Sequence, residues 1–117
     1  MSSCPSSPNC VSSLSEDRKH SIEPLRFDGA RDAARQKLLG ILGKLKRARV
    51  TRSETDYIHA EFRSLIFQFV DDVEFLFAED GNIIHVKSAS RVGYSDLGAN
   101  RRRVERIRAA FESRPNR

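Results

Sequence analysis

The sequence contains no Trp, a single Met and only two Cys among its 117 residues. It also lacks any apolar run near the ~20 residues that a membrane-spanning helix requires. Its longest run, Leu65-Ile66-Phe67, is interrupted by Gln68. The first residues show neither a basic start nor an apolar stretch, so they do not resemble a signal peptide. These absences predict a soluble chain without a membrane span and, as the sequence is written, a cytoplasmic location.

A length of 117 residues, with 38% hydrophobic and 32% charged residues, fits one small globular domain. Residues 1–24 contain eight Ser and three Pro, and we predict that they form a leader lying on or near the domain. Residues 25–114 are then a single α+β domain, and residues 115–117 are a tail.

The net charge of +5 is distributed unevenly along the chain. Residues 31–52 hold eight basic residues and one acidic residue, whereas residues 54–80 hold eight acidic residues and one basic residue. If the first segment is helical and the second forms sheet, their fields could steer an anionic partner. The simpler interpretation is that both segments are solvated faces that keep a small domain in solution.

Two segments show the 3.6-residue period of amphipathic helices. The first is predicted over about residues 29–47, with Asp28 as its N-cap and an apolar stripe of Ala34, Leu38, Ile41, Leu42 and Leu45. The second starts at Asn100 or Asp96 as the cap, and its stripe consists of Val104, Ile107 and Phe111.

The residues between these helices alternate with the period of two that is typical of strands. Short strands are predicted at residues 50–52 and 55–64, followed by a hairpin centred on Asp80-Gly81. Asp-Gly favours a two-residue type I′ turn, which requires positive φ at both positions. In that register Phe75 faces Val86 and Glu74 faces Lys87. The predicted order is α-β-β-β-β-α: an α+β fold with a four-stranded antiparallel sheet and two helices packed on one face.

The segment between the last strand and the last helix is rich in Ser and Gly and contains Arg91. Backbone N–H groups at such a turn, together with a helix N-terminus, can bind an anion. The predicted binding residues are Ser88, Ser90, Arg91, Tyr94, Asp71, Asp72, Asp96 and Arg103. The alternative is a structural loop in which Ser and Asp cap the helix and Arg91 pairs with Asp71 or Asp72.

Asp71 and Asp72 are adjacent in a predicted strand, so their side chains point to opposite faces of the sheet. They therefore do not form a paired-carboxylate acid/base site by themselves, and we expect one of them to form a salt bridge with Arg91 or Arg103. No catalytic residue is predicted.

The cysteines, Cys4 and Cys10, have neither redox-motif nor zinc-site spacing. A small disulfide loop, two free thiols and a reactive thiol all remain open, and the missing signal peptide favours reduced thiols. His59 and His85 share the predicted polar face of the sheet. A metal site there is conceivable, but exposed strand histidines are commoner, so no metal or cofactor is predicted.

An arginine-rich stretch in the last helix, Arg101-Arg102-Arg103 with Arg106 and Arg108, could contact nucleic acid phosphates. However, no aromatic residues interleave with these arginines, and two glutamates dilute the charge. The sequence therefore argues against nucleic acid as a partner.

Three stretches together resemble the bacterial and plastid family of domain of unknown function 1499. They are Cys4-Pro-Ser-Ser-Pro-Asn-Cys10-Val-Ser-Ser, residues 64–75 (SLIFQFVDDVEF) and residues 86–105 (VKSASRVGYSDLGANRRRVE). The resemblance runs from Cys4 to about Phe111, in the family's order. It implies little chemistry, because the function of the family is unknown. Many members look exported or lipid-anchored, whereas this chain shows no leader of that kind.

These observations favour a non-catalytic binding module for a small anionic ligand or an acidic segment of a partner. An enzyme with Cys10 or Cys4 as a thiol nucleophile is the first alternative, and weak nucleic-acid association through the basic helices is the second.

Overall fold

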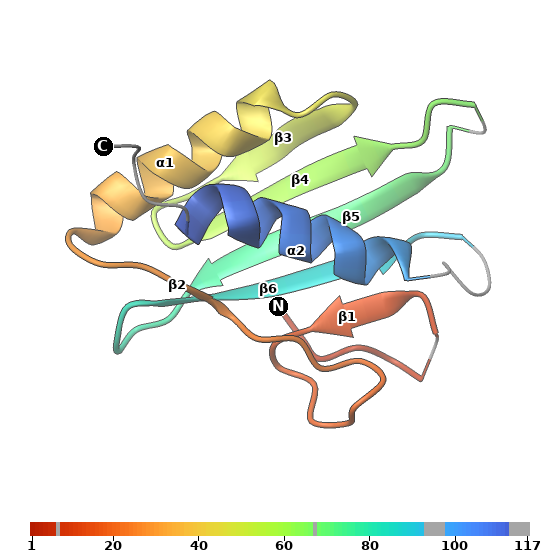
Figure 1. Cartoon of the computed structure of the whole chain (residues 1–117), viewed down its shortest axis with the longest axis horizontal. Coiled ribbons are helices and arrows are strands. Elements are labelled where there is room, and N and C mark those ends of the chain that lie inside the picture. The colour runs from red at the N-terminus through yellow and green to blue at the C-terminus, as the bar shows by residue number, and fades with distance from the viewer. Residues whose placement is uncertain (7, 67, 93–97, 113–117) are drawn as a thin grey trace.

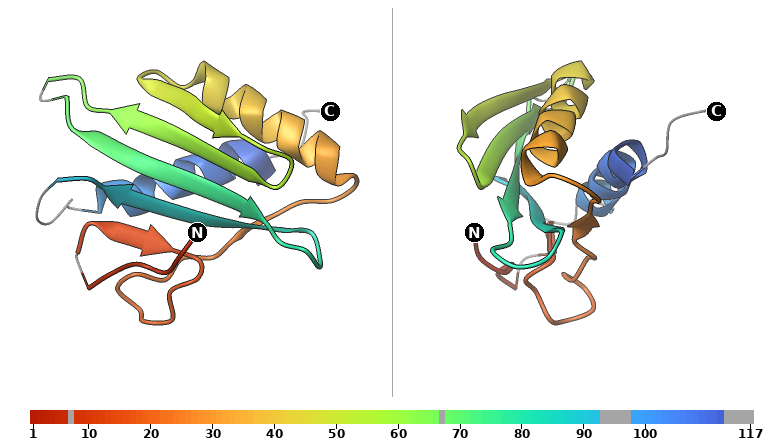
Figure 2. Two further views of the ribbon diagram at one scale, coloured as in Figure 1. Left: turned by 180° about the vertical axis from the view of Figure 1, so that it is seen from behind. Right: turned by 90° about the vertical axis from the view of Figure 1, so that its left-hand side faces the viewer.

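The computed structural model describes residues 1–6, 8–66, 68–92 and 98–112. Its two helices lie on the same face of a twisted sheet (Figures 1 and 2), so the predicted α+β class and the placement of the helices are confirmed. The elements, in chain order, are β1 (Cys10–Ser12), β2 (Leu25–Arg26), α1 (Arg31–Lys44), β3 (Ala48–Ser53), β4 (Tyr57–Arg63), β5 (Val70–Phe77), β6 (Ile83–Ser90) and α2 (Ala99–Glu112).

The sheet has six strands, so the predicted four-stranded sheet is wrong in this detail. Strands β3 to β6 form an antiparallel meander, and both β1 and β2 pair antiparallel with the outer side of β6. These added strands contain three and two residues. Two or three residues are too few to show the alternation of a strand in sequence. Their pairing depends instead on the free edge that β6 offers.

The β5–β6 hairpin has the predicted register, with Phe75 opposite Val86 and Glu74 opposite Lys87. Its turn is not the predicted type I′ turn, because Gly81 has a φ of 78° whereas Asp80 does not adopt positive φ. Residues 78–82 form a longer connection, closed where Ala78 N donates to Ile83 O at 3.0 Å. A longer connection reverses the chain without placing Asp80 in the left-handed region.

Helix α1 presents the predicted apolar stripe to the sheet, with Ala34, Leu38 and Leu42 buried. The predicted Asp28 cap is wrong: Ala30 occupies the N-cap position and makes no side-chain capping bond. The helix ends at Lys44, because the chain turns towards β3 through Arg47, whose φ is 63°.

Helix α2 buries its own predicted stripe of Val104, Ile107 and Phe111 against the same core. The prediction that Asn100 caps α2 is wrong. Asn100 lies inside the helix, and its side chain is fully buried. The other predicted cap, Asp96, lies outside the described residues. Each large apolar side chain buried in this core contributes roughly 1.5–3 kcal/mol to folding.

The outer strand β3 is irregular. Its pairing with β4 shifts between Val50 and Arg52, as at a β-bulge. Upstream of this shift Arg49 lies opposite Glu61 in the ladder, so both side chains project from one face of the sheet.

Candidate functional site

A cavity of about 590 Å³ lies at the end of the sheet where β4 leads into β5. This end is opposite the hairpin turn at Gly81 and appears at the right of Figure 1. Its walls come from the α1–β3 and β4–β5 connections, the adjoining ends of β5 and β6, and α2. The lining residues are Asn9, Leu45, Lys46, Arg47, Phe62, Arg63, Ser64, Leu65, Phe69, Asp71, Ser90, Val92, Ala99, Arg103, Arg106 and Ile107.

The charge of this cavity is strongly positive: its described lining residues include five basic side chains and a single carboxylate, Asp71. That carboxylate is bound to Arg103, at 2.7 Å between Asp71 Oδ2 and Arg103 Nη2. The other four basic lining residues are Lys46, Arg47, Arg63 and Arg106. In the described part of the chain none of them forms an ion pair. Four positive charges therefore border the cavity with no carboxylate partner among the residues that the structure describes.

The remainder of the lining is largely apolar. Ile107 is buried, and Phe62 and Leu45 are partly buried and packed against the core. The Arg103 guanidinium lies 4.9 Å from the centroid of the Phe62 ring, in a cation–π contact that holds both groups in the wall. The cavity thus combines an apolar floor with a basic border.

Behind the cavity a buried polar network is centred on Asn100. Its Oδ1 accepts from Ser88 Oγ at 2.6 Å and from Arg103 Nη1 at 2.8 Å. Its Nδ2 donates to Asn9 O and to Ser90 Oγ, both at 3.0 Å. Because Ser88 and Asn100 are fully buried, these bonds satisfy groups that would otherwise be costly to remove from water. The network ties α2 to β6 and to the residue before β1.

The predicted binding residues are divided between the two faces of the sheet. Asp71, Ser90 and Arg103 line the cavity, and Ser88 lies behind it in the polar network. Asp72 and Arg91 do not line it. Tyr94 and Asp96 lie outside the described residues.

The prediction that the side chains of Asp71 and Asp72 point to opposite faces of the sheet is confirmed by their partners. Asp71 pairs with Arg103 of α2 on the helix-covered face, and Asp72 pairs with Arg91 at 2.7 Å. The salt bridge expected for one of these carboxylates is therefore present at both.

On the face opposite the helices a chain of polar contacts runs across three strands. Thr51 Oγ1 lies 2.6 Å from His59 Nδ1, and His59 Nε2 lies 2.8 Å from Asp72 Oδ1. Arg91 donates to Asp72 and, at 2.7 Å, to Glu61. The Arg91 guanidinium, aided by His59, holds the pKa of Asp72 below its usual value against the opposing effect of desolvation.

This hydroxyl–imidazole–carboxylate order is that of a catalytic triad. Because an ionised Asp72 only accepts, neutral His59 carries its proton on Nε2 and can accept from Thr51 at Nδ1. Thr51, however, is exposed and lies outside the cavity lining. Thr51 and Glu61 were missed from the sequence, although strand alternation places His59 and Glu61 on one polar face.

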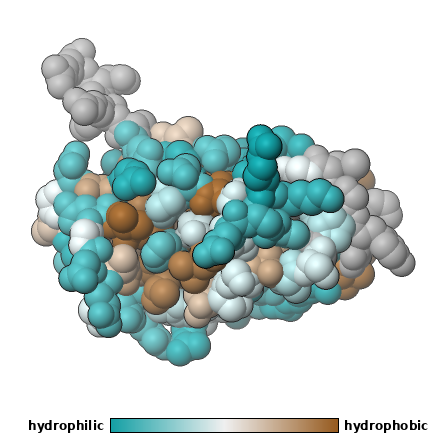
Figure 3. Space-filling view, turned by 90° about the horizontal axis from the view of Figure 1, so that it is seen from below, coloured by the Kyte–Doolittle hydropathy of each residue, from teal (hydrophilic) through white to brown (hydrophobic). Residues whose placement is uncertain are grey.

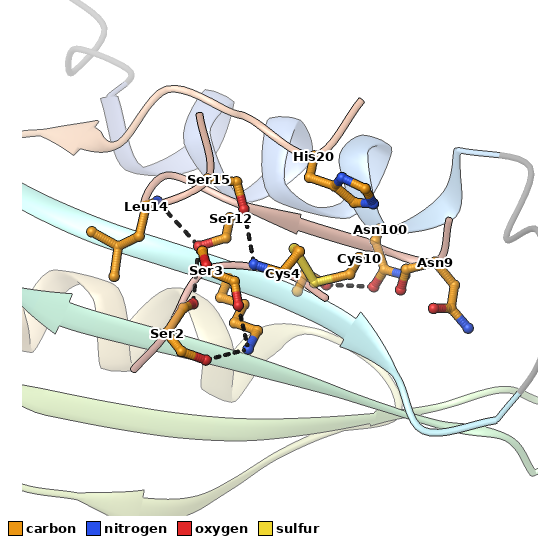
Figure 4. Close-up of a disulfide and its surroundings, with 12 residues drawn as sticks. Ser2, Ser3, Cys4, Asn9, Cys10, Ser12, Leu14, Ser15, His20 and Asn100 are labelled. Atoms are coloured by element: carbon orange, nitrogen blue, oxygen red, sulfur yellow. Dashed lines mark hydrogen bonds between the residues drawn. A yellow bond between two sulfur atoms is a disulfide. The ribbon is translucent and has the colours of Figure 1, made fainter. Parts of the chain in front are cut away.

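The two cysteines form a disulfide, so the expectation of reduced thiols is wrong. Their Cα atoms are 5.8 Å apart, and the bond ties the N-terminal residues to β1 beside Asn100 (Figure 4). Cys4 N also donates to Ser15 Oγ at 2.8 Å. With both sulfurs bonded to each other, neither cysteine is a thiol nucleophile in this structure.

Several arginines of α2 are engaged within the chain. Arg108 donates to Glu23 O and Pro24 O at 2.6 and 2.7 Å, and Arg101 donates to Lys19 O at 3.2 Å. These contacts hold the N-terminal segment against the helix and occupy groups that the nucleic-acid hypothesis would use.

The two histidines that suggested a metal site, His59 and His85, contact different residues. His85 Nδ1 lies 3.1 Å from Ser13 Oγ, whereas His59 contacts Thr51 and Asp72. Over the described ranges no three His, Cys, Asp or Glu residues are grouped closely enough to hold a metal ion. Within the same ranges no helix is long and apolar enough to cross a membrane.

No curated protein matches this sequence. The family model described as "Protein of unknown function (DUF1499)" matches residues 1–111, which include the disulfide, the cavity and the cluster around Asp72. The chain therefore belongs to the DUF1499 family, whose function is unknown.

Proposed function

We propose that this protein is a non-catalytic binding module, and that its cavity takes a small anionic ligand with an apolar portion. The observation that carries the proposal is the combination of an apolar floor and four basic side chains that have no carboxylate partner among the described residues. The volume of about 590 Å³ lies within the range of cavities that enclose small organic ligands.

The two parts of such a ligand would meet different parts of the wall. Arg47, Arg63 and Arg106 present guanidinium groups, which bind carboxylates, phosphates and sulfonates through paired hydrogen bonds. Phe62 and Ile107 offer apolar surface for the remainder of the molecule. An inorganic anion would use only the first of these features, so an amphipathic anion fits the cavity better.

The polar groups in the cavity favour binding over catalysis. Asp71, the one carboxylate among the described lining residues, is paired with Arg103 and therefore poorly suited to accept a proton from a substrate. The thiols proposed as nucleophiles are joined in the Cys4–Cys10 disulfide.

The disulfide also bears on the compartment in which the domain works. Structural disulfides persist in oxidising surroundings and are rare in the cytosol. The Cys4–Cys10 bond therefore favours an exported location over the cytoplasmic one.

A fluorescence titration with anilinonaphthalene sulfonate, an amphipathic anion, tests the proposal. Arg106→Gln should weaken binding by about tenfold, the size of one charge-assisted hydrogen bond. Arg49→Gln is the matched control, since Arg49 is exposed on the opposite face of the sheet. Long-chain carboxylates should displace the probe, and their uncharged alcohols should not.

Equal affinities for the Arg106→Gln and Arg49→Gln variants would contradict the proposal, as would equal displacement by carboxylates and alcohols. Displacement by acidic peptides but not by carboxylates would point instead to an acidic segment of a protein partner.

A further inference from the structure

We infer that the rim of this cavity is a contact face for the surface of a bilayer that contains anionic lipids. Five large hydrophobic side chains are exposed in the described part of the chain, and four of them lie at this end of the molecule. Leu65, Ile66 and Phe69 are 68%, 78% and 54% exposed in the β4–β5 connection, and Val92 after β6 is 65% exposed. Such a concentration of exposed apolar residues marks an interaction site.

These four residues form one surface. Leu65, Phe69 and Val92 line the same cavity, and Ile66 follows Leu65 directly. Arg91 N donates to Val70 O at 3.1 Å, which fixes the segment carrying Val92 beside the start of β5.

The backbone of the β4–β5 connection holds these side chains outward. Ser64 N donates to Phe69 O at 2.8 Å, and Phe69 N donates to Ser64 Oγ at 2.9 Å, so the connection is closed at its base. Gln68 has a φ of 59° and its Nε2 donates to Leu65 O at 3.1 Å. Left-handed backbone at a residue other than Gly has an energetic cost and often occurs at functional sites.

The charge of this end complements an anionic surface. Lys46, Arg47 and Arg63 are exposed and border the same cavity. Three carboxylates in the described part of this region are already paired, Asp71 with Arg103, and both Asp72 and Glu61 with Arg91. Each exposed cation near an anionic membrane contributes about 1 kcal/mol to binding, and exposed apolar side chains add to it by entering the interface.

The same charges argue against a second copy of this chain as the occupant. A symmetric dimer through this face would bring Lys46, Arg47 and Arg63 of one chain against the same residues of the other. Like charges facing one another across an interface oppose association. A bilayer rich in anionic lipids satisfies both the apolar and the basic residues.

Among the described residues, one other large hydrophobic side chain is exposed, that of Leu14. Viewed from below in Figure 3, the edge that carries the N-terminal strands shows hydrophobic patches interrupted by hydrophilic residues. The fifth exposed hydrophobic residue, Leu14, is only 36% exposed. It provides a control site for substitutions.

Co-sedimentation of the full chain with vesicles tests this inference. The protein should bind vesicles of phosphatidylcholine with phosphatidylglycerol and bind pure phosphatidylcholine much more weakly. Leu65→Ser combined with Ile66→Ser should reduce binding by about tenfold or more, because two apolar side chains no longer enter the interface. Leu14→Ser should leave binding unchanged.

Lys46→Gln and Arg63→Gln should each reduce binding by about fivefold, and high salt should reproduce their effect. Unchanged circular dichroism and thermal unfolding would show that the variants remain folded. The inference is overturned by equal binding to both vesicle types, by no binding to either, or by full binding of the Leu65→Ser/Ile66→Ser variant. Dimerisation of the wild type that this variant abolishes would also overturn it, in favour of a second copy.

This inference does not depend on the proposed ligand. Arg106→Gln should weaken binding of anilinonaphthalene sulfonate, whereas the Leu65→Ser/Ile66→Ser variant should weaken vesicle binding. Failure of either proposal can therefore be recognised separately.

Discussion

Arg103 of α2 and Asp71 of β5 join the helix layer to the sheet, with 2.7 Å between Arg103 Nη2 and Asp71 Oδ2. Their side chains are only 18% and 15% exposed, and Arg103 continues through Nη1 to Asn100. This pair forms one wall of the cavity, so the geometry of the proposed binding site depends on it. Its energetic importance follows from burial, because exposed ion pairs contribute little.

Asp71→Asn should destabilise the fold by about 2 kcal/mol, because Arg103 would keep its charge in a largely buried position without a carboxylate. Urea denaturation followed by circular dichroism measures this change. Asp80→Asn, at an exposed residue of the β5–β6 connection, is the matched control and should be nearly neutral. Equal midpoints for the two variants would show that the ion pair contributes no stability.

Asn100→Ala should destabilise the fold by about 3 kcal/mol. The substitution leaves Ser88 Oγ, Ser90 Oγ and Asn9 O without the partner that Asn100 supplies, and an unsatisfied buried polar group costs about 1–3 kcal/mol. Thermal and urea unfolding test this, with Asn82→Ala at an exposed position as control. A loss below about 1 kcal/mol would mean that water or neighbouring groups replace these bonds.

Reduction of the Cys4–Cys10 disulfide should lower stability by about 2 kcal/mol, the chain-entropy value for so short a loop. The unfolding midpoint should therefore fall when a reductant is added. A Cys4→Ser/Cys10→Ser variant should match the reduced protein and show no dependence on reductant. Mass spectrometry should show a gain of two hydrogens on reduction, and their absence would mean that the bond does not form.

Stability should fall in acid partly through Asp72. Its pKa is lowered in the folded state, chiefly by the Arg91 hydrogen bonds, from a usual value of 3.8. A depressed pKa stabilises the fold above the unfolded value, and this stabilisation is lost as pH falls through the folded value. The loss should therefore begin near pH 4 and continue below it, with a size of at most about 1 kcal/mol because the pair is partly exposed.

The comparison variant for this titration is Asp72→Asn, which should be less stable at neutral pH and show a shallower decline below pH 4. Parallel pH curves for the two proteins would show that Asp72 makes no such contribution.

The sequence predicts most of the central fold because its strands and helices have regular patterns. Strand alternation predicts the β5–β6 register, including Phe75 opposite Val86, and the 3.6-residue period predicts the buried stripe of α2. Strands β1 and β2 were missed, since two or three residues pair only where β6 provides an edge. The Asn100 cap was wrong because tertiary packing buries this side chain inside the helix. The Asp28 cap was wrong because the helix begins later, at Arg31.

The candidate site was predicted in part. Asp71, Ser90 and Arg103 line the cavity as expected, because they lie where β5 begins, β6 ends and α2 begins. Lys46, Arg47 and Arg63 were not singled out as site residues. Lys46 and Arg47 lie in the α1–β3 connection and Arg63 ends β4, and only the folded chain brings these segments together. The Cys4–Cys10 bond was also not predicted, because the spacing of the cysteines left three alternatives open.

The shift in pairing at Val50 and Arg52 has a consequence for how the sheet ends. A sheet edge with free backbone groups can recruit a strand from another molecule and so start edge-to-edge polymerisation. At β6 that position is taken by β1 and β2 of the same chain. At β3 the bulge disrupts the regular ladder, and an added strand would also lie beside the charges of Arg49 and Arg52. The irregular outer strand is therefore a poor template for growth of the sheet into fibres.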